Sequence, residues 1–243
     1  RNHSLQNGEL FNPAIGNLIR LWGFHADLPQ SAVPDDTAIA EQTQAAPSMR
    51  DVHIENGQAW SDNPAVRIDL GGYAKGYALD EAAAILRRQG IYNALINIGG
   101  NVMALGTRGE RSWKVGIQHP RKPGVVAALE LHDGEAIGTS GDYQRYFEAD
   151  GKRYCHLIDP RTGRPAEGMQ SVTILVSGEH AGIRSDVLFP TYLQQETVRL
   201  IQAAGGKGEA RRCTVRHAIC IDNFYVRDLA AEFNAHEDVQ SCA

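Results

Sequence analysis

The sequence has no long apolar run, and no stretch approaches the roughly 18 consecutive apolar residues of a membrane-spanning helix. It also lacks a run of Lys or Arg, and its formal net charge is −5 at pH 7. Because nucleic acids and anionic membrane surfaces both attract clustered positive charge, we expect neither as a partner. No signal peptide is recognisable, and the chain begins at Arg1 without a methionine, so we expect a trimmed or disordered start.

Cysteine is also scarce. The four cysteines, Cys155, Cys213, Cys220 and Cys242, form no C-x-x-C pair, so a structural zinc site is not expected. Cys213 and Cys220 are close enough in sequence to form a disulfide across a hairpin, although unpaired thiols are the simpler interpretation. Cysteine usage therefore leaves the redox compartment open.

The chain has 243 residues, of which 42% are hydrophobic and 22% charged, which is typical of a soluble globular domain. It has no repeat and no linker. Strands and helices are mixed without a regular βαβ rhythm. We therefore expect an α+β fold in one domain over residues 1–243, with mixed, mostly antiparallel sheets and packed helices, and a tail of uncertain structure after about residue 228.

Local patterns place several elements. A helix is expected from about Tyr73 to Gln89, stopped by Gly90. Its apolar face would comprise Tyr73, Tyr77, Ala78, Ala82, Ile85 and Leu86. Pro34-Asp35-Asp36 indicates another helix start. "NALINIGG", residues 93–100, reads as a buried strand that ends in a glycine turn. Further turns are expected at Asn56-Gly57, Asp133-Gly134 and Asp150-Gly151.

One stretch, "IDLGGYAKGYALD", combines an acid, two glycines and a lysine before a helix. Glycines let the backbone approach a ligand closely, and a helix N-terminus presents unpaired N–H groups, which suit phosphate. Asp69, Gly71, Gly72 and Lys75 are therefore candidates for a phosphate site. The alternative is a plain tight turn followed by a solvated lysine.

Other candidate loops carry weaker signals. "INIGGN" ends in Gly99-Gly100, and "GTSGDY" offers the Thr139 and Ser140 hydroxyls beside Gly141. In "HLIDPRTGRP", His156 could act as an acid or base, although it could equally serve the turn that follows.

"SDVLFPT" places Asp186 near a hydroxyl, and oxygen ligands of this kind suit Mg²⁺ or Ca²⁺. Read alone, Asp186 could as well be a helix N-cap.

Taken together and in order, these motifs resemble the ApbE family, the FAD:protein FMN transferases. The resemblance rests on "FNPAIGNLIRLWGF", "IDLGGYAKGYALD", "NIGGN", "TSGDYQRYF", "HLIDPRTGRP" and "SDVLFPT", and covers about residues 11–193. It implies an enzyme that binds FAD with a divalent metal, usually Mg²⁺ and otherwise Ca²⁺ or Mn²⁺. Such an enzyme splits the pyrophosphate, releases AMP and attaches FMN to a threonine of a target flavoprotein.

The resemblance also implies a setting for this reaction. The acceptor sequence in the target flavoprotein would resemble S-G-A-T. The location would be periplasmic, with an inner-membrane lipoprotein anchor outside this chain.

The same resemblance assigns roles to residues of this chain. His156 would act as the base near the acceptor hydroxyl, with Asp69 as its rival. Gly72, through its carbonyl, and Asp186 would hold the metal. The implied flavin-contacting residues are Trp22, Gly23, Phe24, His25, Asp69, Lys75, Gly99, Gly100, Thr139, Ser140, Gly141 and Ile158.

The chain departs from the family pattern at several positions. Asn12 and Asn101 stand where an acid is familiar, and the position four residues after Asp186 is Pro190, with the candidate ligand Thr191 one residue further. We also expect the N-terminal part of the family domain to be missing from this chain. Two alternatives stay open: an FAD pyrophosphatase that uses water in place of threonine, and a non-catalytic flavin-binding assembly protein.

Overall fold

The computed structural model describes residues 1–6, 8–26, 32–167, 169–187, 215–222 and 226–228. The chain folds as two compact units. Unit 1 comprises Arg1–Gly72 and Asp142–Glu167, and unit 2 comprises Tyr73–Gly141 and Gly168–Ala243. That residues 1–243 act as one domain stays a prediction. No described helix is long and apolar enough to cross a membrane.

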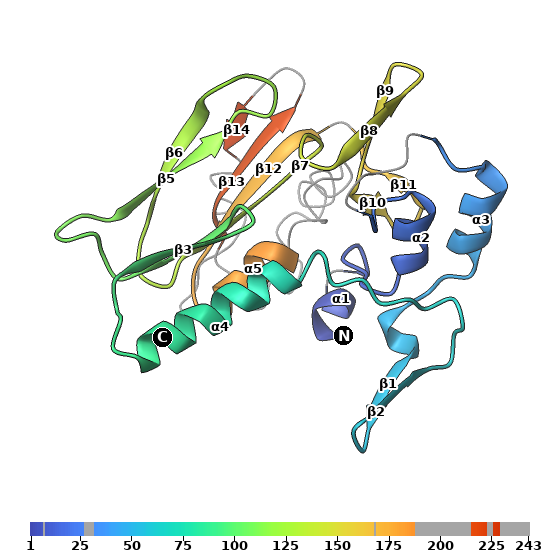
Figure 1. Cartoon of the computed structure of the whole chain (residues 1–243), viewed down its shortest axis with the longest axis horizontal. Helices are drawn as coiled ribbons and strands as arrows, with labels where there is room; N and C mark the ends of the chain where they lie inside the picture. The colour runs from blue at the N-terminus through green and yellow to red at the C-terminus, as the bar shows by residue number, and fades with distance from the viewer. Residues whose placement is uncertain (7, 27–31, 168, 188–214, 223–225, 229–243) are drawn as a thin grey trace, which may run out of the picture. The chain divides into compact units, whose positions relative to one another are not determined.

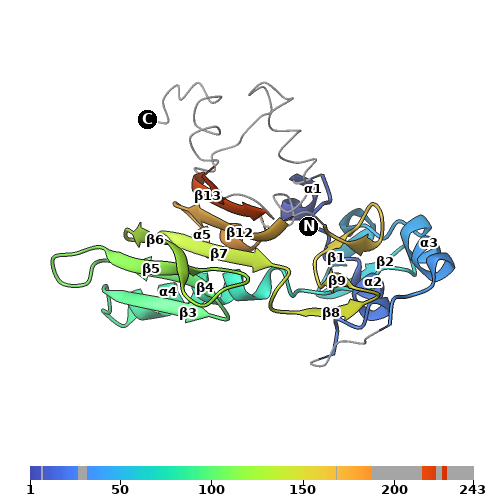
Figure 2. The same cartoon turned by 90° about the horizontal axis from the view of Figure 1, so that it is seen from above.

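Unit 2 is built on an antiparallel sheet with the strand order β14-β13-β12-β7-β4-β3. These strands are β3 (Ala94–Ile98), β4 (Asn101–Leu105), β7 (Ala136–Gly141), β12 (Met169–Val176), β13 (Val215–Asp222) and β14 (Val226–Asp228). A separate hairpin is formed by β5 (Trp113–Gln118) and β6 (Val125–Leu131). The helices α4 (Ala74–Arg88) and α5 (Ala181–Val187) run along the sheet and pack on each other (Figures 1 and 2).

Strand β4 lies inside this arrangement, and all of its residues are buried. Because side chains alternate along a strand, Val102 and Ala104 share one face, where they join an apolar cluster with Leu131 of β6. Asn101 points to the other face, where it contacts α4 and α5. A polar residue is therefore buried between the sheet and the helices.

Two expectations for unit 2 need correction. Helix α4 has the expected bounds, but it buries Gly76, Leu79 and Ala83, whereas Tyr77 and Ile85 are about half exposed. The close crossing of α4 and α5 at Gly76 selects this face in place of the larger side chains. Strand β3 is not buried; it lies at the sheet edge and alternates half-buried with exposed residues.

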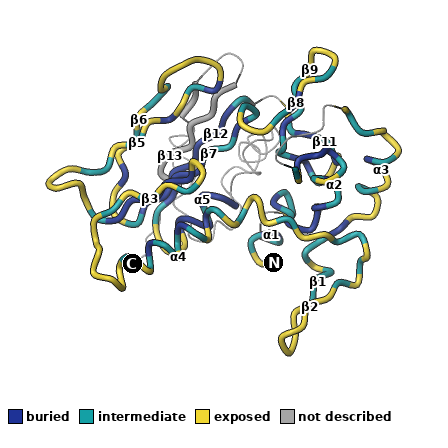
Figure 3. Tube along the Cα trace, in the orientation of Figure 1, coloured by how far each residue is buried: buried dark blue, intermediate teal, exposed yellow. Residues whose placement is uncertain are grey.

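Unit 1 consists of short helices and two-stranded ribbons. Its helices are α1 (Asn2–Gln6), α2 (Gly16–Leu21), α3 (Asp36–Gln44) and the 3₁₀ turn η1 (Met49–Asp51). Its ribbons pair β1 (Val52–Glu55) with β2 (Gln58–Ser61), β8 (Tyr146–Ala149) with β9 (Lys152–Cys155), and β10 (Ile158–Asp159) with β11 (Arg164–Pro165). The tip of the β1–β2 ribbon is exposed (Figure 3).

An aromatic cluster forms the core of unit 1. Trp22 and Phe24, at the end of α2, are fully buried against Phe147 of β8, and Tyr154 of β9 stacks on Trp22 with 5.5 Å between ring centroids. The Trp22 indole N–H donates to the Gly163 carbonyl at 2.7 Å, so its polar atom has a partner inside the core.

The turn predictions are confirmed. Asn56 and Gly57 both have positive φ and close the β1–β2 ribbon, and Asp150 and Gly151 do the same for β8–β9. The helix start at Asp35 is also confirmed, since its carboxylate accepts the Thr37 N–H at 2.8 Å. The α+β fold class with antiparallel sheets is thus confirmed as well.

Candidate functional site

A polar cluster in unit 2 joins the half-buried Lys75 to the buried Asn101 and Asp186. The Lys75 ammonium donates to the Asn101 side-chain oxygen at 3.0 Å, and the Asn101 amide donates to Asp186 at 3.1 Å. A lysine can only donate and a carboxylate can only accept, so these contacts fix the orientation of the amide. Asn101 therefore bridges a cation and an anion while itself fully buried.

Asp186 is the central anion of this cluster, with a relative exposure of 4%. Burial raises the pKa of its carboxyl above the usual range, while the N–H of Gly76 and the nearby Lys75 cation act in the opposite direction. Its second oxygen accepts the backbone N–H of Gly76 at 3.1 Å. The carboxylate is thus held at both oxygens.

The arrangement fits a hard divalent cation. One oxygen of Asp186 accepts the Asn101 amide and the other accepts the Gly76 N–H, and a carboxylate has about four lone-pair sites in all. Mg²⁺ is commonly bound through one or two carboxylates, with water and substrate phosphates completing the shell. Among the described residues, no group of three or more His, Cys, Asp or Glu side chains lies close enough together to hold a metal ion.

The other two predicted metal ligands are not among the residues of this cluster. Gly72 is the last residue of the first segment of unit 1, four residues before Gly76. That its carbonyl binds the metal stays a prediction. Thr191 and Pro190 lie outside the described residues.

The predicted glycine and hydroxyl residues of unit 2 lie on one turn and one strand. Gly99 and Gly100 both have positive φ, and a Cβ on Gly99 would come within 3.2 Å of the Lys75 side chain. Thr139 on β7 shares a hydrogen bond of 2.8 Å with Thr173 of β12, and Ser140 and Gly141 follow it on the strand. The glycine turn is therefore placed beside Lys75, and Thr139 is paired across the sheet with Thr173.

Asp69 shapes the turn that leads to α4. Its carboxylate accepts the Gly71 N–H at 2.9 Å, and its own N–H donates to the Pro13 carbonyl at 2.8 Å. The acid is half-buried, and Gly71 and Gly72 are exposed. The motif therefore forms a tight turn, as the alternative interpretation predicted, and it also leaves the glycine backbone accessible.

The predicted flavin residues near α2 belong largely to the core of unit 1. The side chains of Trp22 and Phe24 are buried, Ile158 belongs to the same cluster, and His25 is exposed. Gly23 has a φ of 76° and turns the chain between the two aromatic residues. Their contact with flavin stays a prediction.

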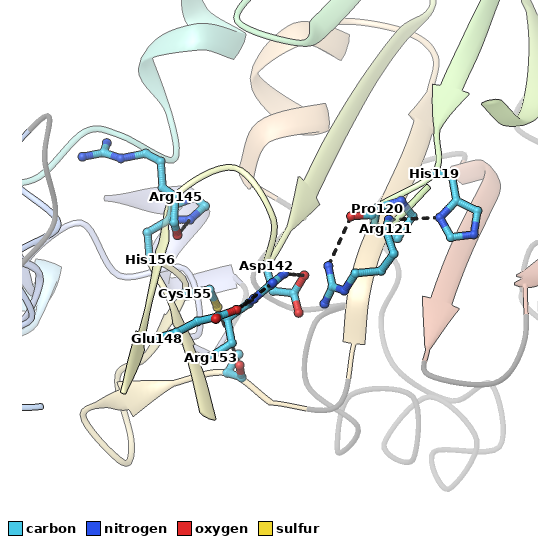
Figure 4. A network of polar contacts seen from close by, with 10 residues as sticks. His119, Pro120, Arg121, Asp142, Arg145, Glu148, Arg153, Cys155 and His156 are labelled. Atoms are coloured by element: carbon cyan, nitrogen blue, oxygen red, sulfur yellow. Dashed lines mark hydrogen bonds and ion pairs between the residues drawn. The ribbon is translucent and has the colours of Figure 1, made fainter. Parts of the chain in front are cut away.

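His156 follows β9 and packs its ring edge-on to Phe24, with 6.4 Å between the ring centroids. Its Nδ1 lies 3.2 Å from the Arg145 carbonyl oxygen (Figure 4). A carbonyl oxygen only accepts, so Nδ1 carries the proton and, in the neutral ring, Nε2 is the basic nitrogen. The contact with Arg145 thus fixes the orientation of the His156 ring, and its role as a base stays a prediction.

The hairpin that precedes His156 is held by a charged side chain. Arg153 pairs with Glu148 at 2.9 Å and with Asp142 at 4.0 Å (Figure 4). Its guanidinium also lies over the Tyr146 ring, 3.9 Å from the centroid. These contacts fix β9 relative to β8 and therefore fix the chain direction at His156.

The structure brings together two groups of predicted residues. In unit 2 it unites Lys75, Gly99 and Asp186, and in unit 1 it unites Trp22, Phe24, Ile158 and His156. Sequence reasoning missed Asp80, which accepts two backbone N–H groups of α5, and treated Asn101 only as a departure. One sequence feature could have pointed to Asp80: helix α5 begins at Ala181, and the residue before it, His180, is not a usual capping residue.

Comparison with known proteins gives consistent similarities. The ApbE family model matches residues 1–207. FAD:protein FMN transferase from Rhodobacter capsulatus is 47% identical over 175 residues, which are 72% of this chain and 34% of the relative. The enzyme of the same name from Klebsiella pneumoniae is 37% identical over 178 residues, 71% of this chain and 53% of the relative.

Solved structures show the same fold. The ApbE protein of Thermotoga maritima superposes with a TM-score of 0.79 at 30% identity, covering 97% of this chain and 74% of its own. The flavin transferase ApbE of Vibrio cholerae gives a TM-score of 0.75 at 28% identity, with coverages of 96% and 73%. The chain spans about half or less of the length of the two curated relatives named above.

Proposed function

Since the chain belongs to the ApbE family, we propose that it is part of a metal-dependent FAD:protein FMN transferase. The enzyme would break the bond between the FMN phosphorus and the bridging oxygen of the FAD pyrophosphate. The same phosphorus would bond to a threonine oxygen of an acceptor flavoprotein, and AMP would leave.

One observation carries the proposal: a lysine and a buried aspartate meet at the first turn of a helix. Lys75 and Gly76 are the second and third residues of α4, and Asp186 accepts the Gly76 N–H. Phosphoryl transfer depends chiefly on positioning and on neutralising phosphate charge. A cation, a helix N-terminus and a carboxylate able to hold Mg²⁺ supply those needs within one cluster.

The roles follow from the side chains. Asp186 would hold the divalent ion, with the Gly72 carbonyl and Thr191 as proposed further ligands; bound there, the ion would neutralise phosphate charge. Lys75 would bind a phosphate oxygen, which requires that its ammonium exchange part of its contact with Asn101. The exposed Gly71 and Gly72 would let the FAD phosphates approach the backbone.

The acceptor hydroxyl needs a base, because a threonine hydroxyl is a weak nucleophile until its proton is removed. His156 is our candidate, since its Nδ1–H is committed to the Arg145 carbonyl and Nε2 is the basic nitrogen. Asp69 remains the rival. The S-G-A-T-like acceptor motif and a periplasmic, lipid-anchored location are proposed from the family resemblance alone.

The test is incubation of the chain with FAD, with and without Mg²⁺, in the presence of an acceptor fragment carrying S-G-A-T. Intact mass of the fragment and AMP release are measured together. Gain of one FMN mass with one AMP, only when Mg²⁺ is present, is the expected result.

Other outcomes contradict the proposal in different ways. AMP and free FMN without a mass gain would identify a pyrophosphatase. FAD binding with no AMP in either condition would contradict catalysis by this chain. The same assay on the Asp186→Asn variant serves as the matched control, because it removes the proposed ion-binding charge with little change in side-chain size.

A further inference from the structure

Helix α5 begins without a cap of its own. The residue before it, His180, has a φ of 55°, and its carbonyl accepts the first helical bond, from the Arg184 N–H. Histidine is not among the residues that usually cap a helix N-terminus. The N–H groups of Gly182 and Ile183, the second and third residues of the helix, need an acceptor from elsewhere.

Asp80 of α4 supplies both acceptors. One carboxylate oxygen accepts the Gly182 N–H at 2.9 Å and the other accepts the Ile183 N–H at 2.8 Å. These are the positions that an N-cap side chain serves within its own helix. Asp80 is thus the N-cap of a helix that begins about one hundred residues later in the chain.

The relationship is reciprocal. Helix α4 also lacks a side-chain cap of its own at Tyr73, and its third N–H, from Gly76, is accepted by Asp186 of α5. Each helix therefore gives one aspartate to the N-terminus of the other, where the helix dipole favours a negative charge. Asp80 and Asp186 thus hold α4 and α5 together where the two helices cross.

The crossing leaves little room for adjustment. Gly76 and Gly182 face each other so closely that a Cβ on Gly182 would lie 2.5 Å from the Gly76 carbonyl oxygen. Ser185 adds a hydrogen bond of 2.8 Å to the Gly182 carbonyl. Asp186, one residue after Ser185, is consequently placed by the same contacts that fix the start of α5.

We propose that Asp80 is a positioning residue for the divalent ion that Asp186 would hold. The inference rests on the proposed function, and it gives a role to Asp80, which was not among the residues predicted from the sequence. Asp80 would act without contacting the ion, because both of its oxygens accept N–H groups of α5. It fixes the N-terminus of α5 and thereby the direction of the Asp186 carboxylate. Outer partners of this kind typically change metal affinity by about 10–100-fold when they are removed.

The test is a titration of the FAD-free protein with Mn²⁺, followed by the loss of the free-ion electron paramagnetic resonance signal. Asp80→Asn keeps one acceptor oxygen but turns an amide N–H₂ toward a backbone N–H. We expect the folded Asp80→Asn protein to bind Mn²⁺ about 10–100-fold more weakly than wild type. If Asp80→Asn does not fold, the same Mn²⁺ titration is made with Asp80→Ser.

The control is Asp133→Asn. Asp133 also lies in unit 2 and also holds a distant backbone N–H, that of Gly106 at 2.8 Å. A merely structural effect would lower the melting temperature of both variants and leave the Mn²⁺ affinity of both unchanged. Positioning predicts that the affinity falls only in the Asp80 variants, even at temperatures where every variant is folded.

The outcomes separate the two proposals. Wild-type affinity in folded Asp80→Asn, with affinity lost in Asp186→Asn, would overturn the role of Asp80 and leave the proposed function standing. Unchanged Mn²⁺ binding in Asp186→Asn, or no binding by wild type, would overturn both. Weaker binding in Asp80→Asn with wild-type binding in Asp133→Asn supports the positioning role.

Discussion

Helices α3 and α5 are stabilised at their starts in opposite ways. Helix α3 is capped by the residue directly before it, Asp35, whose carboxylate accepts the Thr37 N–H. Helix α5 is capped by Asp80, which lies on another helix. The first contact is local and exposed, whereas the second is part-buried and joins two helices of the same unit.

The difference concerns what each aspartate can affect. A local cap stabilises its own helix, and its loss stays confined to that helix. The caps of α4 and α5 bind the two helices to each other, and one of them, Asp186, is the candidate metal ligand. Stability and the proposed chemistry are therefore coupled at α5 and independent at α3.

The largest expected effect is on turnover. Asp186→Asn should lower the rate of Mg²⁺-dependent AMP release from FAD by about 10²–10³-fold, because it removes the charge that would hold the ion. Asp35→Ala, the local counterpart, should leave the rate unchanged. Steady-state AMP assays on both variants check this, and an equal loss in both would contradict the contrast between the helices.

The next effect is on stability. Asp80→Ala should leave the N–H groups of Gly182 and Ile183 without their acceptor, in a segment where both residues are buried. A buried unsatisfied amide costs about 1–3 kcal/mol. Urea unfolding should show a clear loss for Asp80→Ala and a smaller one for Asp35→Ala. A reversed order would show that the distant cap is the weaker one.

A loss of similar size is expected from a single methyl group at the crossing. Gly182→Ala places a Cβ 2.5 Å from the Gly76 carbonyl oxygen and 2.7 Å from a carboxylate oxygen of Asp80, and such overpacking typically costs about 1–3 kcal/mol. Gly72→Ala, whose Cβ would make only an ordinary 3.4 Å contact with Phe11, serves as the control. Equal urea midpoints for the two variants would mean that α4 and α5 can move apart to admit the methyl group without a loss in the free energy of unfolding.

The smallest effect is the pH dependence of the local cap. The Thr37 N–H lowers the pKa of the Asp35 carboxyl below its usual 3.8. The stability contributed by Asp35 is therefore present above pH 3.8 and is lost as pH falls through the lowered folded-state pKa. Melting temperatures of wild type and Asp35→Ala should differ at neutral pH and converge in strong acid. A constant difference would contradict the charge-assisted cap.

The same contrast explains which features could be predicted from the sequence. The start of α3, the ends of α4 and the Asn-Gly and Asp-Gly turns were all predicted correctly, because each is determined by neighbouring residues. The buried face of α4 and the edge position of β3 were wrong. Both depend on contacts between segments distant in sequence, namely the Gly76–Gly182 crossing and the pairing order of the sheet.

The candidate site divides in the same way. Asp186 and Lys75 were predicted from motifs that resemble a known family, and the structure places them in one cluster through Asn101. Asp80 could not be predicted, since an aspartate inside a helix has no local signature of capping a different helix. Only the absence of a capping residue before α5 indicated that a distant acceptor was needed.

The most direct test of the central claim, that Asp186 holds the divalent ion, is an anomalous difference map from crystals soaked in Mn²⁺. A peak about 2.0–2.3 Å from an Asp186 carboxylate oxygen, and absent in crystals of Asp186→Asn, is the predicted result. A Mn²⁺ peak bound to other groups, with Asp186 still accepting the N–H groups of Gly76 and Asn101, would contradict it.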